Sequence, residues 1–117
     1  MIDRKRASKI LRTVPIPQAF LFFTDIGQYT GVFAVSLTDF SEKLESISLK
    51  SIEFHFTRGD FERWIRETLG DKYLANRIKG IDRSIQGEEL RKSILRIVER
   101  HLNMLKQITR TNKPIKT

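Results

Sequence analysis

The chain has 117 residues, no cysteine, two histidines and a formal net charge of +8. This length suits one domain that buries a core without disulfides or metals, and the lack of cysteine excludes a disulfide framework, thiolate zinc sites and cysteine nucleophiles. No stretch is long and apolar enough to cross a bilayer, and residues 1–12 are polar and basic where a secretory signal would be apolar. We therefore expect a cytoplasmic protein without a cofactor.

The positive charge lies at the two ends of the chain. Residues 1–12 carry five basic side chains and one acidic one, residues 106–117 carry four basic and no acidic ones, and residues 13–105 carry 13 of each. Basic ends on a neutral centre favour a polyanionic partner over a general role in solubility. This distribution predicts three parts: a basic N-terminal arm (1–14), a single globular domain (15–109) and a basic C-terminal tail (110–117).

The first half of the globular part predicts two strands and a helix. Pro15 and Pro17 mark a change of element after the arm, because the residue before a proline disfavours helix. The aromatic run 19–23 suits a buried strand, the glycine-containing segment 24–31 a turn, and 32–35 a shorter second strand. A helix is then expected after Ser36, an N-cap with Asp39 in the capping-box position; its apolar residues have helical spacing (Leu37, Phe40, Leu44 and Ile47).

Segment 51–57 alternates strictly between polar and apolar residues, which predicts a third strand. One face of this strand would lie in the core. The other face, with Glu53, His55 and Thr57, would be open to solvent. Gly59 and Asp60 then turn the chain into the next element, with Asp60 as its cap.

The second half predicts three helices. Residues at helical spacing mark the first of them (Phe61, Trp64, Ile65, Thr68 and Leu69). Gly70 ends it, Asp71 caps a short helix that Gly80 closes, and a long helix runs from Glu88 to about Thr109. The whole pattern predicts an α+β or small open α/β fold with a two- to three-stranded sheet, about four helices and basic terminal arms. The long C-terminal helix is expected to pack across the sheet.

Four side chains are candidates for catalysis, namely Asp25, Glu53, His55 and Asp60. Glu53 and His55 would project from the same face of the predicted strand, where an acid/base pair is sterically possible. Asp60 is better explained as a helix cap and Asp25 as a turn former. No nucleophile elbow, phosphate loop, dinucleotide fingerprint or metalloprotease signature is present. We therefore expect no enzyme, and a small hydrolase built around His55 is the weakest alternative.

The basic residues carry the main functional hypothesis, because lysine and arginine neutralise phosphates. The candidates for RNA binding are the cations of both ends together with a row on the last helix: Arg4, Lys5, Arg6, Lys9, Arg12, Lys92, Arg96, Arg100, Lys106, Arg110, Lys113 and Lys116. The row on the helix follows i, i+4 spacing, although its glutamates make an ordinary solvated face an equally good interpretation. Phosphate contacts alone leave DNA open as a partner.

Two segments of the sequence form a recognisable pattern. They are the aromatic run together with the glycine-containing segment 24–31, and residues 51–71, which read SIEFHFTRGDFERWIRETLGD. Together they resemble an uncharacterised family of prokaryotic proteins, common in archaea, whose members share the pattern SIEFHxxRGDFExWIxxxLGD. The resemblance covers roughly residues 19–109. It implies a shared fold and an archaeal or bacterial cytosolic origin, and it implies no activity.

The leading hypothesis is an RNA-binding protein, a ribosome-associated or ribosomal accessory protein of an archaeon that anchors on rRNA through its basic termini. Its expected partners are rRNA and neighbouring ribosomal proteins, with no membrane and no small-molecule substrate. The alternative is a protein-interaction or regulatory module that partners a cytosolic enzyme through Glu53, His55 and Thr57.

Overall fold

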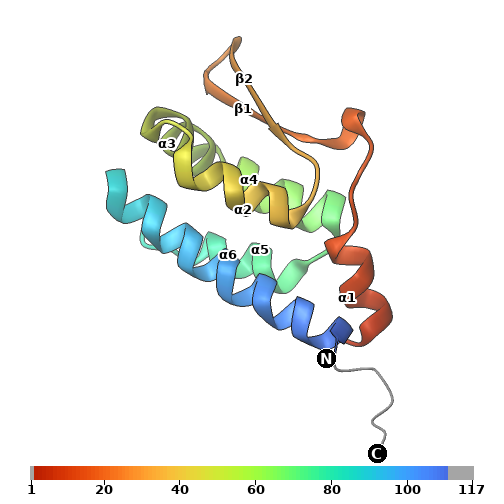
Figure 1. Ribbon diagram of the computed structural model, residues 1–117. Helices are drawn as coiled ribbons and strands as arrows, with labels where there is room; N and C mark the ends of the chain where they lie inside the picture. The colour runs from red at the N-terminus through yellow and green to blue at the C-terminus, as the bar shows by residue number, and fades with distance from the viewer. Residues whose placement is uncertain (1, 111–117) are drawn as a thin grey trace, which may run out of the picture.

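The computed structural model describes residues 2–110, which form an α+β fold of six α-helices and a two-stranded antiparallel hairpin (Figure 1). This confirms the predicted fold class and the long C-terminal helix. The elements in chain order are α1 (Arg4–Leu11), a 3-10 turn η1 (Ile16–Gln18), β1 (Phe20–Asp25), β2 (Gln28–Ala34), α2 (Leu37–Ser46), α3 (Leu49–Arg58), α4 (Asp60–Trp64), a π-helical turn η2 (Ile65–Leu69), α5 (Lys72–Lys79) and α6 (Gly87–Arg110).

The elements stack in layers. The hairpin lies against α2 and α3, and α6 packs on the far side of these helices, with α5 beside it (Figure 1). The prediction that the last helix crosses the sheet is wrong, because α6 packs against helices α1, α2, α3 and α5. In the described part of the chain the sheet has two strands, and α2 and α3 stand between it and α6.

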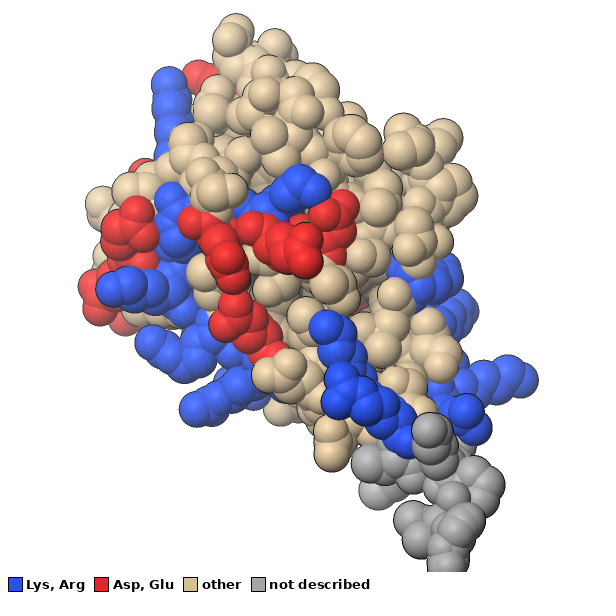
Figure 2. Space-filling model, viewed as in Figure 1, with Lys and Arg blue, Asp and Glu red and all other residues tan. Residues whose placement is uncertain are grey.

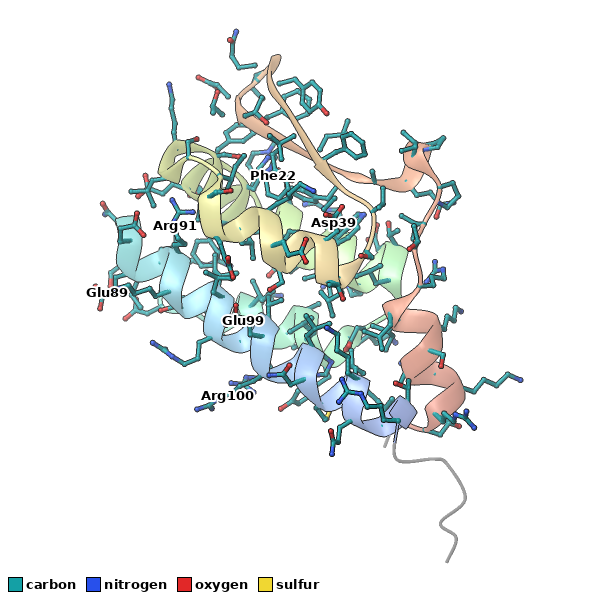
Figure 3. All side chains as sticks on the ribbon, viewed as in Figure 1. Phe22, Asp39, Glu89, Arg91, Glu99 and Arg100 are labelled. Carbon is teal, nitrogen blue, oxygen red and sulfur yellow. The ribbon has the colours of Figure 1, made fainter. Side chains whose placement is uncertain are left out.

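The core begins at the aromatic run, as predicted. Phe20 and Phe22 of β1 are buried, and Phe22 lies between the hairpin and the helices (Figure 3). Their rings meet Phe40 of α2 at centroid distances of 5.6 and 6.0 Å, and Phe20 also meets Phe61 and Trp64 at 5.3 and 5.7 Å. These distances are typical of favourable aromatic pairs. The cluster therefore fixes the hairpin on α2 and α4.

The predicted third strand at 51–57 is wrong, because this segment is the helix α3. Ser48 accepts a hydrogen bond from the Ser51 amide at the N-cap, and Gly59 ends the helix in the left-handed region with φ +76°. Ile52, His55 and Phe56 are buried at i, i+3 and i+4, which is helical spacing. Two polar residues, Ser51 and His55, complete the buried stripe, so the apolar residues alone give a false period of two.

The remaining helices follow the predicted spacing. Phe61, Trp64, Ile65 and Leu69 are buried, although the last turn of this stretch is π-helical. Ser36 and Asp71 cap α2 and α5, since their side chains accept hydrogen bonds from the Asp39 and Leu74 amides. The predicted stripe of the last helix also faces the core, where five of its residues are buried (Leu90, Ile94, Val98, Leu102 and Leu105).

The basic N-terminal segment is a helix docked on the body. Asp3 caps α1 by accepting a hydrogen bond from the Arg6 amide, and Ala7 and Ile10 of this helix are buried at i and i+3. Val14, beyond the end of the helix, is also buried. This face of α1 packs against α6. Residues 4–14 therefore pack as part of the folded body instead of projecting from it as an arm. Among residues 2–110, no helix combines the length and apolar character needed to span a membrane.

Candidate nucleic-acid interface

The outward face of α1 presents cations to a cleft. Burial of Ala7 and Ile10 leaves Lys5 and Lys9, one i, i+4 step apart, exposed on the same helix as the exposed Arg4. Lys5, Arg6 and Lys9 line a cleft of about 550 Å³ whose far wall is formed by Leu69 and Gly70. The acidic side chain at this cleft, Asp3, is engaged in capping α1. Lysine ammonium groups therefore dominate its electrostatics.

Two of the predicted RNA-binding arginines bind the protein's own backbone. Arg12 donates to the Thr68 carbonyl at 2.9 Å and Arg6 donates to the Gly70 carbonyl at 3.4 Å. The last carbonyls of a helix lack intrahelical partners and form the negative end of its dipole. Arg6 and Arg12 therefore fasten α1 to the end of η2, a role that the sequence pattern did not indicate.

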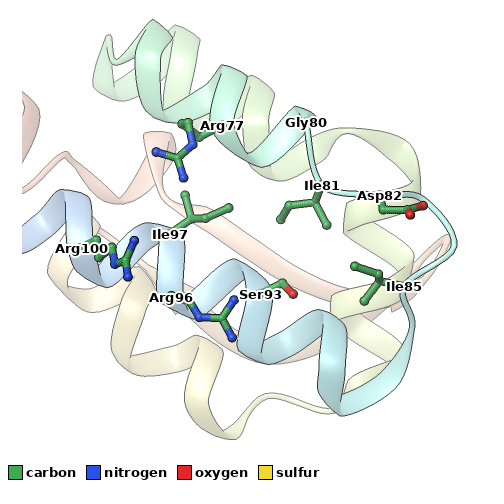
Figure 4. A pocket seen from close by; sticks show the side chains of 9 residues that line it. All are labelled: Arg77, Gly80, Ile81, Asp82, Ile85, Ser93, Arg96, Ile97 and Arg100. Atoms are coloured by element: carbon green, nitrogen blue, oxygen red, sulfur yellow. The ribbon is translucent and has the colours of Figure 1, made fainter.

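A second cation-lined groove lies between α5 and α6 (Figure 4). It has a volume of about 400 Å³ and combines Arg96 and Arg100 of α6 with Arg77 of α5, a residue that was not predicted. Three isoleucines also line the groove (Ile81, Ile85 and Ile97), and Ile97 lies among the arginines (Figure 4). Its carboxylate, Asp82, accepts hydrogen bonds from the amide and hydroxyl of Ser84. The carboxylate is thus engaged locally, and the three arginines share the groove with apolar side chains.

Arg96 and Arg100 are exposed, and neither forms a hydrogen bond or ion pair with another residue in the part of the chain that the structure describes. Arg100 projects from α6 away from the hairpin (Figure 3). Lys92, the third member of the predicted row, is also exposed. Unpaired guanidinium groups beside a groove are suited to binding an anion bidentately.

The remaining predicted cations lie towards the C-terminal end of α6. Lys106 is half-buried and Arg110 is exposed, and α1 lies beside this end of α6 (Figure 1). Figure 2 shows lysines and arginines gathered on this part of the molecule, whereas the hairpin surface carries few charges. Lys113 and Lys116 lie outside the described residues. The fold thus brings the basic N-terminal helix to the basic end of α6.

The proposed protein contact at Glu53, His55 and Thr57 does not form one exposed face, because on a helix His55 lies on the opposite side from Glu53 and Thr57. Glu53 is half-buried and accepts a hydrogen bond from the Gly87 amide at 2.8 Å, whereas Thr57 is exposed and His55 is only 3% exposed. The open strand face on which the contact was expected is therefore absent. Glu53 instead ties α3 to the first residue of α6.

His55 lies in a hydrogen-bonded cluster with Asp60. Its Nε2 accepts from the Phe23 amide at 2.8 Å, so its Nδ1 carries the proton and donates to Asp60 Oδ2, also at 2.8 Å. Arg58 and Arg63 donate to the same carboxylate at 2.9 Å. Asp60 is thus the acceptor of this cluster, and the expectation that it caps a helix by a side-chain hydrogen bond is wrong. Both ring nitrogens of His55 are engaged with protein groups.

The cluster also sets the protonation of its members. Burial lowers the pKa of His55 below its usual value, by more than the hydrogen bond and charge of Asp60 raise it. Burial raises the pKa of Asp60, but the hydrogen bonds from His55, Arg58 and Arg63 outweigh burial and the net pKa is lowered. The neutral ring and the ionised carboxylate hold β1 on α3.

A second buried pair, His101 with Asp71, joins α6 to the N-terminus of α5. Asp71 Oδ1 accepts from the Leu74 amide and its Oδ2 bonds to His101 Nε2. Burial raises the pKa of Asp71, and the hydrogen bonds from His101 and Leu74 lower it by more. The sequence indicates Asp71 as a cap but gives no sign of its partner 30 residues away. No group of three or more potential metal ligands occurs within residues 2–110.

Comparison with known proteins gives a single family. The model of a family of unknown function, DUF5752, matches residues 17–116, which leaves α1 outside the match. No curated protein and no solved structure matches the chain.

Proposed function

The chain belongs to the DUF5752 family, which has no known function to transfer, and we propose from its surface that it is a cytoplasmic RNA-binding protein. The expected site is the side of the molecule formed by α1, α5 and α6. The expected ligand is rRNA, beside which the hairpin and the remaining helices contact neighbouring ribosomal proteins. An archaeal ribosome is the setting that the resemblance and the charge together suggest.

One observation carries the proposal: both clefts on this side are lined by cations, and their carboxylates are engaged by the local backbone. Lys5 and Lys9 line the cleft at α1, whereas Arg96 and Arg100 line the groove between α5 and α6. The acids Asp3 and Asp82 accept backbone hydrogen bonds beside them. A concave surface on which charges of one sign outnumber those of the other concentrates ions of the opposite sign. A phosphate backbone is the polyanion that matches such a surface in size and charge.

The proposal is tested with the full chain and a labelled single-stranded RNA, measured by fluorescence anisotropy. If six or more phosphates are bound, the affinity falls by at least about 300-fold between about 50 and 200 mM salt, because each phosphate contact with a single strand contributes about 0.7 to the slope of log affinity against log salt. Replacing Lys5 and Lys9 together by glutamine weakens binding at low salt by at least about fivefold.

The matched control removes the same charge elsewhere. Lys43 of α2 and Lys50 of α3 lie apart from both clefts, and Lys43 pairs with Asp39. The control variant Lys43→Gln with Lys50→Gln therefore keeps the wild-type affinity. Equal losses in the two double variants, or no binding to RNA by the wild type at low salt, would refute the proposal. Equal affinity for a DNA strand of the same sequence would leave a nucleic-acid site without a preference for RNA.

A second candidate function, the protein-interaction module, is favoured by the exposed apolar side chains of the hairpin. Leu21, Ile26 and Tyr29 are 42%, 70% and 46% exposed, and Leu21 and Ile26 line a hollow of about 270 Å³ together with Phe54 and Arg58. An apolar surface of this kind fits a protein better than it fits RNA. The Lys5 and Lys9 double variant separates the two functions, because association with ribosomes is lost if RNA is the anchor and persists if a protein is.

A further inference from the structure

Two exposed apolar side chains lie next to the cation-lined groove between α5 and α6. Six large apolar side chains are exposed among the described residues; four of them belong to the hairpin and the turn before it (Ile16, Leu21, Ile26 and Tyr29). The other two, Tyr73 and Met104, are 56% and 41% exposed and line the same small hollow. Packing in the core therefore does not account for the exposed surface of either side chain.

This hollow continues the groove between α5 and α6. It has a volume of about 140 Å³ and shares Arg77, Ile97 and Arg100 with the 400 Å³ groove. Arg77 donates to the Tyr73 hydroxyl at 3.1 Å, and its guanidinium lies 5.9 Å from the centre of the Tyr73 ring. The Tyr73 ring also lies 5.5 Å from that of His101. We call the groove and the hollow together the seam between α5 and α6. Along this seam, arginine side chains alternate with apolar or aromatic ones.

A single nucleic-acid strand shows a matching alternation of charged phosphates and flat, largely apolar bases. Its phosphates suit guanidinium groups, and its bases, when unstacked, pack against aromatic, apolar and arginine surfaces. A duplex offers its phosphates but keeps its bases stacked inside, and so it has nothing to place against Tyr73. The arrangement of Tyr73 and Met104 between cations therefore favours a single strand over a duplex.

We infer that the seam between α5 and α6 binds single-stranded RNA, with a base in the hollow of Tyr73 and Met104 and phosphates on Arg96 and Arg100. This inference rests on the proposed function and narrows its ligand class. It gives the two clefts different roles. The lysines of α1 attract any phosphate backbone, whereas the seam between α5 and α6 distinguishes single-stranded from double-stranded RNA.

The test compares an RNA oligonucleotide with its duplex, binding each to the full chain at low salt. The wild type binds the single strand at least about fivefold more tightly, since one stacked base is worth about that factor or more. The variant Tyr73→Ser loses this preference and keeps the affinity for the duplex. Tyr29→Ser is the matched control: Tyr29 is 46% exposed on the hairpin, and its loss leaves both affinities unchanged.

Each outcome bears on one claim. A wild type that binds neither form refutes the proposed function, whereas equal affinities for both forms refute the inference alone. If Tyr73→Ser and Tyr29→Ser behave alike, the hollow takes no base. Photocrosslinking gives an independent readout with a 4-thiouridine oligonucleotide: crosslinks to the peptides of Tyr73 or Met104 support the inference, and crosslinks confined to α1 or the hairpin overturn it.

Discussion

At the scale of single residues, the hydrogen bonds of His55 make the fold dependent on a neutral imidazole. The ring accepts from the Phe23 amide through Nε2 and donates to Asp60 through Nδ1, and a protonated ring has no acceptor left for the amide. His55 is also packed against aromatic rings, with Phe20 at 4.8 Å and Phe54 at 5.0 Å. Protonation would therefore break the link between β1 and α3 inside an apolar setting.

This arrangement predicts that the free energy of unfolding falls as the pH falls below 6.5, the pKa of an ordinary histidine. The lowered pKa of folded His55 means that the unfolded chain takes up a proton that the folded chain does not, so acid favours unfolding. One such group changes the free energy of unfolding by at most about 1.4 kcal/mol per pH unit. Asp60 and Asp71, whose pKa values are lowered, add stability that is lost only as the pH falls below 3.8.

The measurement is urea unfolding between pH 7 and pH 5 for the wild type and His55→Gln, at constant ionic strength. The variant is less stable at pH 7, but its free energy of unfolding depends less on pH, and the difference between the two slopes gives the contribution of His55. Parallel pH profiles would contradict the prediction. Titration of the His55 ring by NMR in the wild type gives the same answer without relying on a variant.

At the scale of elements, Gly59 joins two helices through a single left-handed residue. Its φ is +76°, and its amide donates to carbonyls at the end of α3 while Asp60 begins α4. A side chain in this region costs about 1–2 kcal/mol. An added Cβ would also stand 3.1 Å from Glu62 Oε2. Gly59 therefore sets the direction in which α4 leaves α3 and brings Asp60 to His55.

We expect Gly59→Ala to lower the free energy of unfolding by about 1–2 kcal/mol. Gly80→Ala is the control, because Gly80 has φ −78° and its added Cβ would meet the Asn76 and Arg77 carbonyls at 3.5 and 3.6 Å, which is ordinary contact. That change is neutral or adds up to about 1 kcal/mol by reducing the freedom of the unfolded chain. Equal losses in the two variants, measured by chemical denaturation, would show that the conformation of Gly59 is unimportant.

The same elements show how far sequence reasoning reaches. Regular apolar spacing located α2, the stretch from Phe61 to Leu69 and α6, because each stripe consists of apolar residues. The segment at α3 was predicted as a strand because two residues of its buried helical face, Ser51 and His55, are polar. A search for regularly spaced apolar residues does not detect a buried face that includes polar side chains. In α1, basic residues outnumber the two buried residues, Ala7 and Ile10. The sequence therefore predicted a basic arm and did not indicate that a short apolar face packs on the body.

At the scale of the whole molecule, the basic residues were predictable but their arrangement was not. Lys5, Lys9, Arg96 and Arg100 follow from the sequence as candidates, whereas Arg77 and Tyr73 enter the site only because α5 packs beside α6. Arg6 and Arg12 were predicted as ligands of phosphate but bind the carbonyls that follow η2 or lie within it. All of these cations look equivalent in the sequence. Tertiary packing decides which of them bind the protein's own backbone and which remain available to a ligand.

The arrangement predicts that one long RNA engages both clefts at once. α6 has 24 residues and so extends about 36 Å, with the arginine groove along its middle and α1 beside its C-terminal end (Figure 1). A long single strand can bind at both places, whereas one of about six nucleotides fits within a single site of this kind. The number of phosphates bound, and hence the dependence of affinity on salt, therefore grows with RNA length.

The double variant Arg96→Gln with Arg100→Gln tests how the salt dependence of affinity changes with RNA length. For a long single strand, loss of two phosphate contacts reduces the slope of log affinity against log salt by about 1.4, and adding Lys5→Gln and Lys9→Gln doubles the reduction to about 2.8, since each contact contributes about 0.7. A strand of about six nucleotides occupies one cleft at a time, so the combined change reduces its slope by no more than about 1.4. Lys43→Gln with Lys50→Gln changes neither slope, because these lysines lie outside both clefts. Equal reductions for the long and the short strand would mean that the two clefts do not bind the same RNA molecule.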